Sequence, residues 1–575
     1  MHAPGIDTGD LILRGDDPIP SKLTSRHTIL QYAVVLSLFI LLVSPKLNQP
    51  VTDDEIYEID NAERILSGEP IRVFVPPLYD YALAFSLKFL GREPWVTRLI
   101  GVSSALAALC ILMTIIRRSY PETQPQISFL AGALLASNPA FIQGALLVHI
   151  DNTLLVPLTL LWVWFLSEYA RTNFVRHLVW AGTILTLALF AKFTTPLLLI
   201  LAGFLFMLLN HAGKLLPYSL MSAVSLLAFL VGWWIFSKAT DLSFMEPFSH
   251  AVQRGALYSD LLTKQTMTWI LNVLTIVVWF TPLLLLSVAV ALPAAFRGVM
   301  SQRDPAALLL ISAVAICSYV AFSTVNHGFP KYFLPALPLL VGVTVYHLGK
   351  GIELHQTPMR SLLRPFAFAT VFFFILLDDP ILLLRYDLRE TQVLGTGKRE
   401  LFLTALRQIL VCMVPLGLWF LRFSRWRFLR RIFLPAFLAH LLVISFAFSA
   451  ALSLKQATAP YQTNYSYGER GTVQLHTYLQ QHLRPPDQIL ATKDILYRLG
   501  RSSEYVPRDV WGSPSNLLQR LSMPETRFLI TSIPSISVNT LKLLKDDPDL
   551  RATISTRFTK HEIGTYAIYE RGITN

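Results

Sequence analysis

Carboxylates, amines and a histidine recur in this chain at the points where long apolar runs begin or end. These residues are Asp53, Asp54, Glu55, Asp151, Lys192, His327 and Lys331. Ionisable side chains at a membrane boundary are costly and tend to mark function. An acidic group there could deprotonate an acceptor hydroxyl, while cations could hold a phosphate and stabilise it as a leaving group. At this height the phosphate would belong to a lipid-linked donor, so the pattern indicates group transfer at a membrane surface.

Most of these residues also have a structural interpretation, and the residue types alone leave both open. The stretch from Thr52 to Glu55 fits a capping box, and acidic residues in a first helical turn complement the helix dipole. Lys192 could extend to the lipid headgroups, and Lys331 could be an anchor beside an interfacial His327. Asp151 favours function more clearly, because an unpaired carboxylate beside a span is expensive.

The elements that position these residues are apolar helices. The chain has 575 residues, of which 53% are apolar and only 15% are charged, whereas soluble domains carry about 25% charged residues. A helix needs roughly 20 apolar residues to cross a bilayer, and stretches such as 153–168 and 432–453 approach or reach that length. The composition therefore predicts a polytopic α-helical membrane protein.

We expect about 13 transmembrane helices in a membrane domain at 28–453, preceded by a cytoplasmic tail at 1–27 whose following span acts as the insertion signal. The predicted spans lie near 28–45, 95–116, 127–142, 152–168, 177–191, 194–209, 217–236, 268–296, 305–323, 332–349, 362–378, 401–421 and 432–453. Cys110, Cys317 and Cys412 all lie inside these apolar runs and are expected to be small core residues.

The basic residues predict the orientation. With the N-terminus in the cytoplasm, the inner loops hold Arg117, Arg118, Arg171, Arg176, Lys214, Arg297, Arg303, Lys350, Arg360, Arg364, Arg422, Arg425, Arg427, Arg430 and Arg431. This satisfies the positive-inside rule and puts the acidic and lysine clusters on the outer face. The formal net charge of +12 then reflects contacts with anionic lipid rather than nucleic acid. We expect an inner (plasma) membrane protein.

Three segments are predicted outside the membrane. The long outer loop at 46–94 contains two amphipathic helices, one over 53–67 ended by Gly68 and one over 77–90 ended by Gly91. A second outer segment covers 237–267. The region 454–575 reads as a small soluble α/β domain on the periplasmic or extracellular side. Its predicted elements are strands at 488–491, 527–532 and 565–569 and a helix at 472–483.

The ordered set of motifs resembles the GT-C-type glycosyltransferases that use polyprenyl-phosphate sugars. This branch includes the protein O-mannosyltransferases and the bacterial lipid A aminoarabinose transferase. The resemblance covers roughly residues 30–350. The matching segments are 53–68 (DDEIYEIDNAERILSG), 76–91 (PPLYDYALAFSLKFLG), 97–99 (TRL, with Arg98), 149–156 (HIDNTLLV), 191–196 (AKFTTP) and 331–335 (KYFLP).

The resemblance implies roles for individual residues. Asp54, with Glu55, matches the acidic pair that acts on the acceptor, and Asp53 is the alternative if the register shifts by one. Asp151 matches the second essential carboxylate. The residues expected to bind the donor phosphate are Lys192, Lys331, His327 and Arg72. Family members invert the anomeric centre, and the Asp54–Asp151 pair could hold one divalent cation, although no cofactor is certain.

The chain departs from the family at one position. Many relatives have a basic residue directly before the Pro-Pro-Leu-Tyr stretch, where this chain has Val75. If that residue normally touches the donor phosphate, Arg72 or Lys192 must compensate, or the donor differs. The departure therefore puts the identity of the donor in question more than the class of reaction.

The leading hypothesis is a membrane glycosyltransferase that moves a sugar from a polyprenyl-phosphate donor to a glycan, lipid or protein acceptor. The alternative is a multi-pass transporter or lipid flippase. Transporters place polar residues near the midplane within repeated halves, and the sequence contains neither, although Pro157 and Pro196 leave room for kinks. A non-catalytic assembly protein with a glycan-binding outer domain is a third hypothesis.

Overall fold

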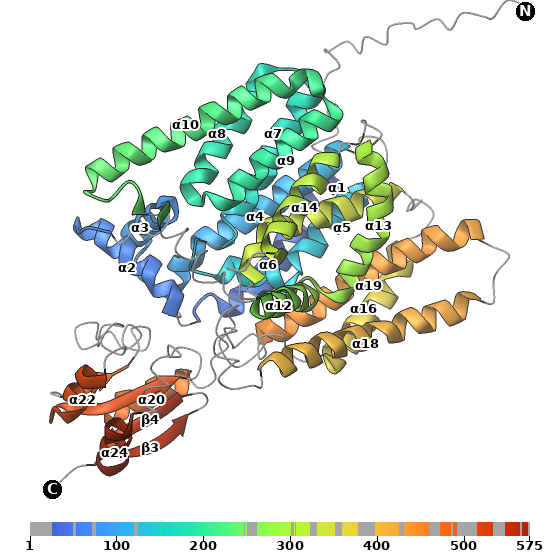
Figure 1. Ribbon diagram of the computed structural model, residues 1–575. Coiled ribbons are helices and arrows are strands. Elements are labelled where there is room, and N and C mark those ends of the chain that lie inside the picture. Colours follow the sequence, from blue (N-terminus) through green and yellow to red (C-terminus); the bar gives the residue numbers. More distant parts are fainter. Residues whose placement is uncertain are drawn as a thin grey trace, which may run out of the picture.

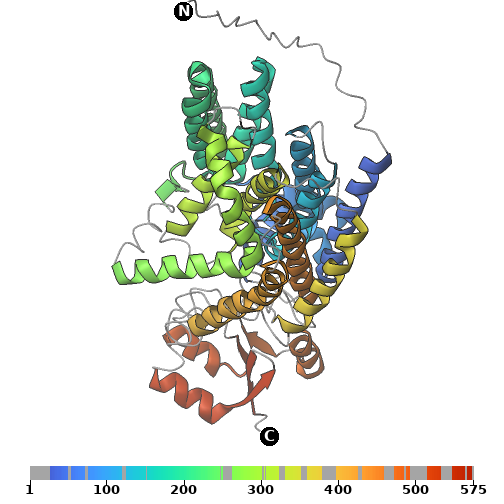
Figure 2. The same cartoon turned by 90° about the vertical axis from the view of Figure 1, so that its right-hand side faces the viewer.

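A bundle of long helices and a small four-stranded sheet make up the computed structural model (Figures 1 and 2). The structure describes residues 26–49, 53–71, 76–119, 125–150, 152–246, 248–249, 262–300, 304, 306–322, 330–350, 359–377, 397–424, 430–458, 472–484, 487–491, 514–532, 547–563 and 566–572. The helical bundle holds the first described residues, and the sheet holds the last (Figure 1).

In the part of the chain that the structure describes, the bundle consists of α-helices and three short 3₁₀ helices (η). They are α1 (Arg26–Val43), η2 (Ser44–Lys46), α2 (Asp53–Ser67), α3 (Leu78–Leu90), α4 (Pro94–Ser119), α5 (Pro125–Ala136), α6 (Pro139–Leu146), α7 (Leu155–Thr172), α8 (Val175–Ala191), α9 (Thr194–Asn210), η3 (Ala212–Lys214), α10 (Leu215–Ala239), α12 (Leu262–Phe280), α13 (Pro282–Met300), α14 (Ala307–Phe322), η4 (Pro330–Ala336), α15 (Leu337–Lys350), α16 (Met359–Leu376), α18 (Gly397–Ser424) and α19 (Arg430–Thr458).

Several of these helices have the length and composition of membrane spans. In the part of the chain that the structure describes, six helices meet both criteria, and the bent pair α5 and α6 would make a seventh. Shorter apolar helices, including α8, α9 and α14, lie among them. α10 exposes large apolar side chains such as Leu216 and Val224, as lipid-facing surfaces do. A membrane location fits these features, while the number of 13 spans stays a prediction.

Two predicted spans differ from the observed helices. The stretch 268–296 was expected to be one helix, but it lies in α12 and α13, with a break at Thr281. Thr281 adopts a left-handed φ of 71° and precedes Pro282, and a residue before proline is driven out of the α conformation. The stretch 127–142 bends by 60° between α5 and α6, where the Asn138 side chain accepts a hydrogen bond from the amide of Ala140.

The two amphipathic helices of the first outer loop form as predicted. α2 ends before Gly68, which has a φ of 74°, and α3 ends before Gly91, with a φ of 93°. Both angles fall in the region that glycine tolerates best. The two helices pack on each other and on the start of α4 through buried apolar residues, which are Ile56, Ile59, Leu83, Leu87 and Val96. This packing fixes the rotation of α2 about its axis, and with it the direction in which Glu55 and Glu58 point.

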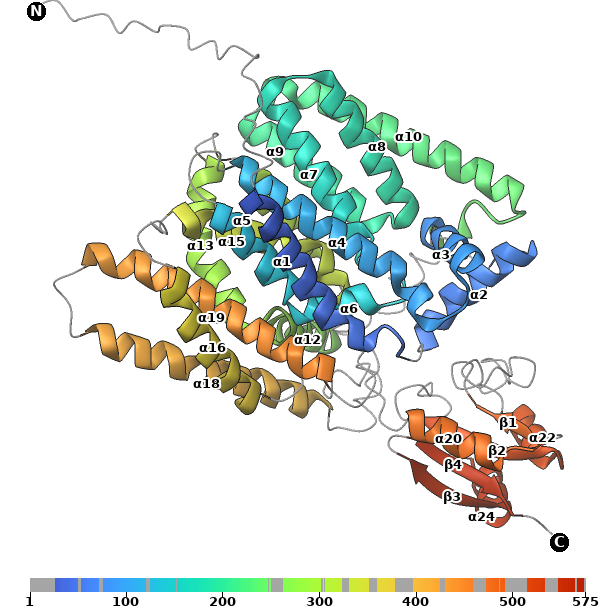
Figure 3. The same ribbon diagram turned by 180° about the vertical axis from the view of Figure 1, so that it is seen from behind.

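The C-terminal region contains α20 (Thr472–His482), α22 (Pro514–Ser522) and α24 (Pro548–Arg557), together with strands β1 (Gln488–Leu490), β2 (Thr526–Ser532), β3 (Phe558–Ile563) and β4 (Tyr566–Arg571). The strand order is β1-β2-β4-β3, with β1 parallel to β2 and the other pairs antiparallel. Three of these strands lie close to predicted positions, whereas β3 was not predicted. The sheet lies beyond the end of the bundle where α2 is found (Figures 1 and 3). That it forms a separate outer-face domain at 454–575 stays a prediction.

Candidate active site

The carboxylate of Glu55 links three segments of the chain at the start of α2. Its Oε2 lies 3.6 Å from Nη2 of Arg98 on α4, and both side chains are completely buried. Its Oε1 accepts a hydrogen bond of 3.0 Å from the backbone amide of Val148, in the loop after α6. Arg98 also donates to the carbonyl oxygens of Leu47 and Pro94. Glu55 therefore fixes α2 against α4 and against the loop that contains Asp151.

A second glutamate continues this pattern one turn along α2. Glu58 Oε1 accepts a hydrogen bond of 3.4 Å from the backbone amide of Ile150, and it lies 3.7 Å from Nε2 of His149. Positions 55 and 58 face the same side of the helix. Two glutamates on one face of α2 therefore accept hydrogen bonds from the backbone amides of Val148 and Ile150. These amides lie three residues and one residue before Asp151 in the sequence.

Glu58 in turn contacts a buried carboxyl group on α3. Asp80 is only 2% exposed, and its Oδ2 accepts a hydrogen bond of 3.2 Å from the side-chain amide of Asn61. Burial raises the pKa of Asp80 to about 6, although hydrogen bonds with Glu58 and Asn61 oppose the shift. Two carboxyl groups form a hydrogen bond only when one of them is protonated. Asp80 and Glu58 therefore share a proton when they bond.

Two lysines converge on one aromatic ring elsewhere at this end of the bundle. The Nζ of Lys192, at the end of α8, lies 4.7 Å from the centre of the Tyr332 ring. The Nζ of Lys331, in η4, lies 5.6 Å from the centre of the same ring. Lys331 is only 4% exposed. Two cations from segments about 140 residues apart in the sequence thus lie against the same ring.

The start of α9 adds to the positive potential around Lys192. α9 begins at Thr194, two residues after Lys192, and the N-terminus of a helix carries a partial positive charge and amides that lack intrahelical acceptors. Lys192 itself is extended, with a φ of −164°, so it forms the sharp corner between α8 and α9. A lysine beside a helix N-terminus is well placed to bind an anion.

Apolar packing brings the lysine corner and the acidic helices into one neighbourhood. Leu78 of α3, Leu154 after the 149–152 loop and Ala191 beside Lys192 belong to one cluster of packed residues. Ile71, which ends the described part of the α2 segment, packs with Leu189 of α8. The segments that hold the predicted acid groups and the predicted lysines are therefore neighbours.

Some predicted site residues lie beyond what the structure describes. Asp53 and Asp54 occupy the first turn of α2, but only their backbone is described. Asp151, Arg72 and His327 lie outside the described residues, although Ile150 and Asn152 bracket Asp151. The roles of Asp53, Asp54, Glu55, Asp151, Lys192, Lys331, His327 and Arg72 stay predictions. Within the described segments, no three His, Cys, Asp or Glu residues gather as metal ligands.

The basic loops lie together at the other end of the bundle. Arg117 donates a hydrogen bond of 2.6 Å to Thr28 at the start of α1, and Arg118 and Arg171 both pair with Glu168 at the end of α7. Lys214 donates to the carbonyl oxygen of Ala170. Three of the predicted inner loops, around Arg117, Arg171 and Lys214, thus lie together near the start of α1, whereas α2 follows the end of that helix.

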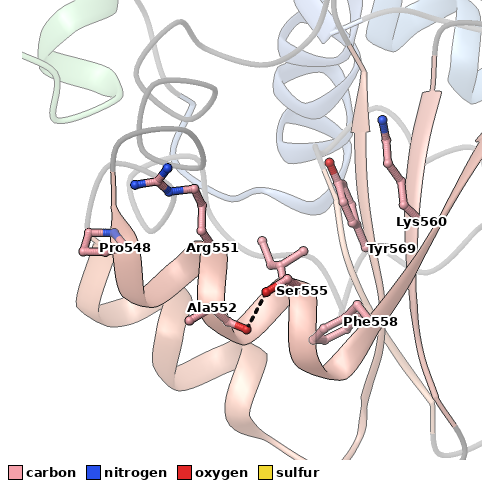
Figure 4. Close-up of a pocket in the computed structure, with 8 residues that line it drawn as sticks. Pro548, Arg551, Ala552, Ser555, Phe558, Lys560 and Tyr569 are labelled. Carbon is pink, nitrogen blue, oxygen red and sulfur yellow. Dashed lines mark hydrogen bonds between the residues drawn. The ribbon is translucent and has the colours of Figure 1, made fainter.

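An open pocket of about 540 Å³ lies in the C-terminal region, between α24 and the strands β3 and β4. Arg551 and Lys560 stand at its rim, with Tyr569 between them in the view of Figure 4. None of the predicted site residues lines it. Its cations and ring could bind an anionic or sugar group, but it is separate from the site that α2 and the lysines form.

Comparisons with known proteins identify the fold. Residues 75–235 match the family described as dolichyl-phosphate-mannose-protein mannosyltransferase. ArnT from Cupriavidus metallidurans bound to undecaprenyl phosphate has a similar crystal structure, with a TM-score of 0.61 and 14% identity over 95% of this chain and 98% of ArnT. This chain has the GT-C glycosyltransferase fold. The apo state of ArnT gives a TM-score of 0.57 at 13% identity, over 94% of this chain and 97% of ArnT. No curated protein sequence matches the chain.

The GT-C resemblance drawn from the motifs is thus confirmed, and the matched segment 75–235 contains the motifs around Arg98, Asp151 and Lys192. Sequence reasoning missed three contributors to the site: Tyr332, Glu58 and Asp80. Asp80 carried a usable signal, because a carboxylate inside the apolar stretch 77–90 needs a partner. Tyr332 carried none, because an aromatic residue beside a lysine is common at membrane surfaces.

Proposed function

We propose that this protein is a membrane glycosyltransferase that moves a sugar from a polyprenyl-phosphate donor to an acceptor at the outer membrane surface. The observation that carries the proposal is the convergence of Lys192 and Lys331 on Tyr332, at the end of the bundle that holds the acidic helix α2. A phosphate bound there would lie near the N-terminus of α9, which begins two residues after Lys192.

The chemistry follows from these positions. Asp54 or Asp151 accepts the proton of an acceptor hydroxyl, and the resulting oxygen attacks the anomeric carbon of the donor sugar. The bond between that carbon and the phosphate oxygen breaks, and its electron pair stays on the phosphate. Lys192, Lys331 and the positive end of α9 stabilise the charge that develops on the leaving phosphate. A single displacement of this kind inverts the anomeric centre.

The GT-C comparisons support a lipid-linked donor. The ArnT crystal structure contains undecaprenyl phosphate, and the family that matches residues 75–235 is described by a dolichyl-phosphate-mannose donor. We therefore take undecaprenyl-phosphate mannose as the first donor to test. A divalent ion between Asp54 and Asp151 would neutralise charge there.

The test is carrier release by purified protein in lipid nanodiscs. Protein is incubated with undecaprenyl-phosphate mannose, then with the corresponding arabinose and aminoarabinose donors, and free undecaprenyl phosphate is measured with and without envelope glycan, lipid or peptide acceptors. Asp54→Asn and Asp151→Asn should each reduce release by about 10²-fold or more, the scale of losing a catalytic acid–base group. Full activity in both variants would contradict the assignment.

The control for folding is the ability of each variant to insert in the membrane and bind undecaprenyl phosphate. The transporter alternative makes a different prediction, because a flippase moves the intact lipid-linked sugar across a sealed vesicle without releasing carrier. The assembly-protein alternative gains support if no donor of the panel releases carrier. Sugar transfer without lipid translocation would decide in favour of the enzyme.

A further inference from the structure

The loop before Asp151 lies against α2 through backbone hydrogen bonds rather than through side-chain packing alone. Val148 donates its amide to Glu55 and Ile150 donates its amide to Glu58, at 3.0 Å and 3.4 Å. The next residue in the chain is Asp151. The hydrogen bond from Ile150 to Glu58 therefore holds the backbone one residue before the predicted catalytic carboxylate.

We propose that Glu58 is a positioning residue that holds His149 and Ile150 against α2, and that the action of the next residue in the chain, Asp151, depends on this contact. This inference rests on the proposed function for its catalytic consequence, but not for the contact itself. Glu58 lies one helical turn from Asp54 on the same helix, so the loop is tied to the element that carries the other predicted carboxylate.

Glu58 is itself held from a second element. Asp80 on α3 bonds to it and to Asn61, which lies on α2 one turn beyond Glu58. A buried carboxyl pair is expensive unless it is fully bonded, which favours a role that depends on an exact geometry.

A positioning role and a catalytic role predict opposite effects for two small substitutions. Glu58→Gln keeps the length of the side chain, a carbonyl oxygen for the Ile150 amide and an N–H donor for Asp80. Glu58→Asp keeps the carboxylate but shortens the side chain by one methylene, so it no longer reaches the loop. If Glu58 acts by position, Gln replaces it and Asp does not. If it acted as a base, Gln would be inactive.

The first readout is hydrogen exchange of the peptide that spans 147–154, measured in nanodiscs with the full chain. Glu58→Asp should increase exchange of the Ile150 amide by about three- to tenfold, the scale of one lost hydrogen bond. Glu58→Gln should leave it within about twofold of the unaltered protein. This readout needs no substrate, so it tests the contact even if the proposed reaction is wrong.

The second readout is the split between kcat and KM for undecaprenyl-phosphate mannose. Glu58→Asp should lower kcat by about tenfold or more with KM within about twofold, because the lysines that hold the phosphate lie on other elements and a small misplacement of a reacting group is costly. Glu58→Gln should retain at least about half of kcat. Binding of undecaprenyl phosphate confirms that each variant is folded.

Glu63 provides a matched control on the same helix. Its side chain is partly exposed and pairs with Arg92 at 3.6 Å, away from the 149–152 loop. Glu63→Gln and Glu63→Asp should therefore leave both exchange and kcat within about twofold, since exposed pairs contribute little. If these controls change exchange of the loop as much as the Glu58 variants do, the effect is general and the inference is wrong.

The outcomes separate this inference from the proposed function. An inactive Glu58→Gln, or unchanged exchange in Glu58→Asp, overturns the positioning role. Activity that persists in Asp54→Asn and Asp151→Asn overturns the proposed function alone, and the exchange result still decides whether Glu58 holds the loop. Faster exchange with a normal kcat in Glu58→Asp would mean that the contact exists but does not govern Asp151, which also overturns the inference.

Discussion

At the scale of single residues, Lys192 and Lys331 are the side chains whose surroundings favour anion binding most directly. Both ammonium groups contact the ring of Tyr332, and Lys331 is almost fully buried. Two ammonium groups against one ring, beside the N-terminus of α9, make the local potential positive, and a positive potential favours a bound anion. A lysine that only reached for lipid headgroups would extend into solvent instead, so the structural interpretation of Lys331 as a simple anchor fits its burial poorly.

Replacing either lysine should weaken donor binding more than it slows the chemical step. We expect Lys192→Gln and Lys331→Gln each to raise the Kd for undecaprenyl phosphate by about tenfold, since one charge-assisted contact is worth roughly 1.5–3 kcal/mol. Binding to protein in nanodiscs measures this. Lys88→Gln is the control, because Lys88 also lies against a ring, that of Phe89, but on the exposed face of α3. Equal effects in all three variants would contradict a specific site.

Asp80 makes stability depend on pH in a direction that can be worked out. The pKa of Asp80 is raised by burial from 3.8 to about 6, so its favourable contribution is complete below pH 4 and is lost as the pH rises through 6. Asp80→Asn removes a charge that is buried above pH 6. We expect the variant to be more stable than the unaltered protein at pH 7, by roughly 3 kcal/mol at most, and to lose that advantage near pH 4.

Thermal unfolding in detergent between pH 4 and pH 8 measures the effect of Asp80→Asn. Asp60→Asn is the control, because Asp60 lies on the neighbouring helix α2 but is partly exposed and pairs with Arg64. A parallel pH profile for Asp80→Asn and the unaltered protein would show that Asp80 does not titrate in this range.

The sequence singles out candidate site residues but not their contacts. The order of the motifs was enough to single out Lys192 and Lys331, because ionisable residues at the ends of apolar runs are rare. The bonds from Glu58 to Ile150 and Asp80 could not be predicted, since they depend on how α2, α3 and the 149–152 loop pack. Such contacts join residues up to 92 positions apart in the chain.

At the scale of elements, the buried pair of Glu55 and Arg98 joins α2 to α4. Both side chains are fully buried, and Glu55 also receives the amide of Val148. The capping-box interpretation of 52–55 is therefore incomplete, because the Glu55 carboxylate bonds to two other elements, α4 through Arg98 and the loop after α6 through Val148. The resemblance places Glu55 beside the acceptor. Its contacts favour a structural contribution, which leaves Asp54 as the stronger candidate base.

Breaking this pair from one side should be costly. Arg98→Leu leaves the Glu55 carboxylate buried without its cation, which we expect to cost about 3–5 kcal/mol of stability. The double variant Arg98→Leu, Glu55→Leu removes both charges and should recover part of that loss, even though it stays inactive if Glu55 is needed for transfer. The free energies of unfolding of the unaltered protein, Arg98→Leu, Glu55→Leu and the double variant measure the coupling. A loss in the double variant equal to the sum of the two single losses would mean that the two side chains do not interact.

Helix boundaries were predicted where glycine or proline marks them and missed where packing decides. Gly68 and Gly91 end α2 and α3 as expected. The break at Thr281 was missed because the apolar run continues through it, even though Pro282 gave a local signal. The bend between α5 and α6 has the same origin, at Asn138 and Pro139. Hydropathy alone gives the length of an apolar stretch, but it does not show where a helix within that stretch breaks or bends.

At the scale of the whole molecule, charge divides the bundle into two ends. Arg117, Arg118, Arg171 and Lys214 gather near the start of α1 and the end of α7. The acidic helix α2 lies at the other end, on the side of the C-terminal sheet (Figure 3). The lysine corner at Lys192 lies next to α3, because the adjacent Ala191 packs in one cluster with Leu78. The positive-inside rule then places the basic end in the cytoplasm and the proposed site outside.

This orientation can be measured with single cysteines. Cys110, Cys317 and Cys412 are first replaced by serine, because all three are free thiols on apolar helices. Glu93→Cys lies in the exposed turn between α3 and α4, and Ala212→Cys lies in the exposed turn between α9 and α10. A membrane-impermeant maleimide added to intact cells, or to spheroplasts if an outer membrane is present, should label Glu93→Cys and not Ala212→Cys. After permeabilisation both should react.

The labelling pattern bears on the reaction as well as on the topology. In the proposed reaction, Lys192 and Lys331 bind the donor phosphate at the outer membrane surface. The turn at Glu93 lies at the same end of the bundle as these lysines, so it has to face the same compartment as the acceptor. If Ala212→Cys were labelled first, the lysine corner would face the cytoplasm. The acidic helices would then act on cytoplasmic acceptors, and the C-terminal sheet, which lies at their end of the bundle, would belong to the cytoplasm with them.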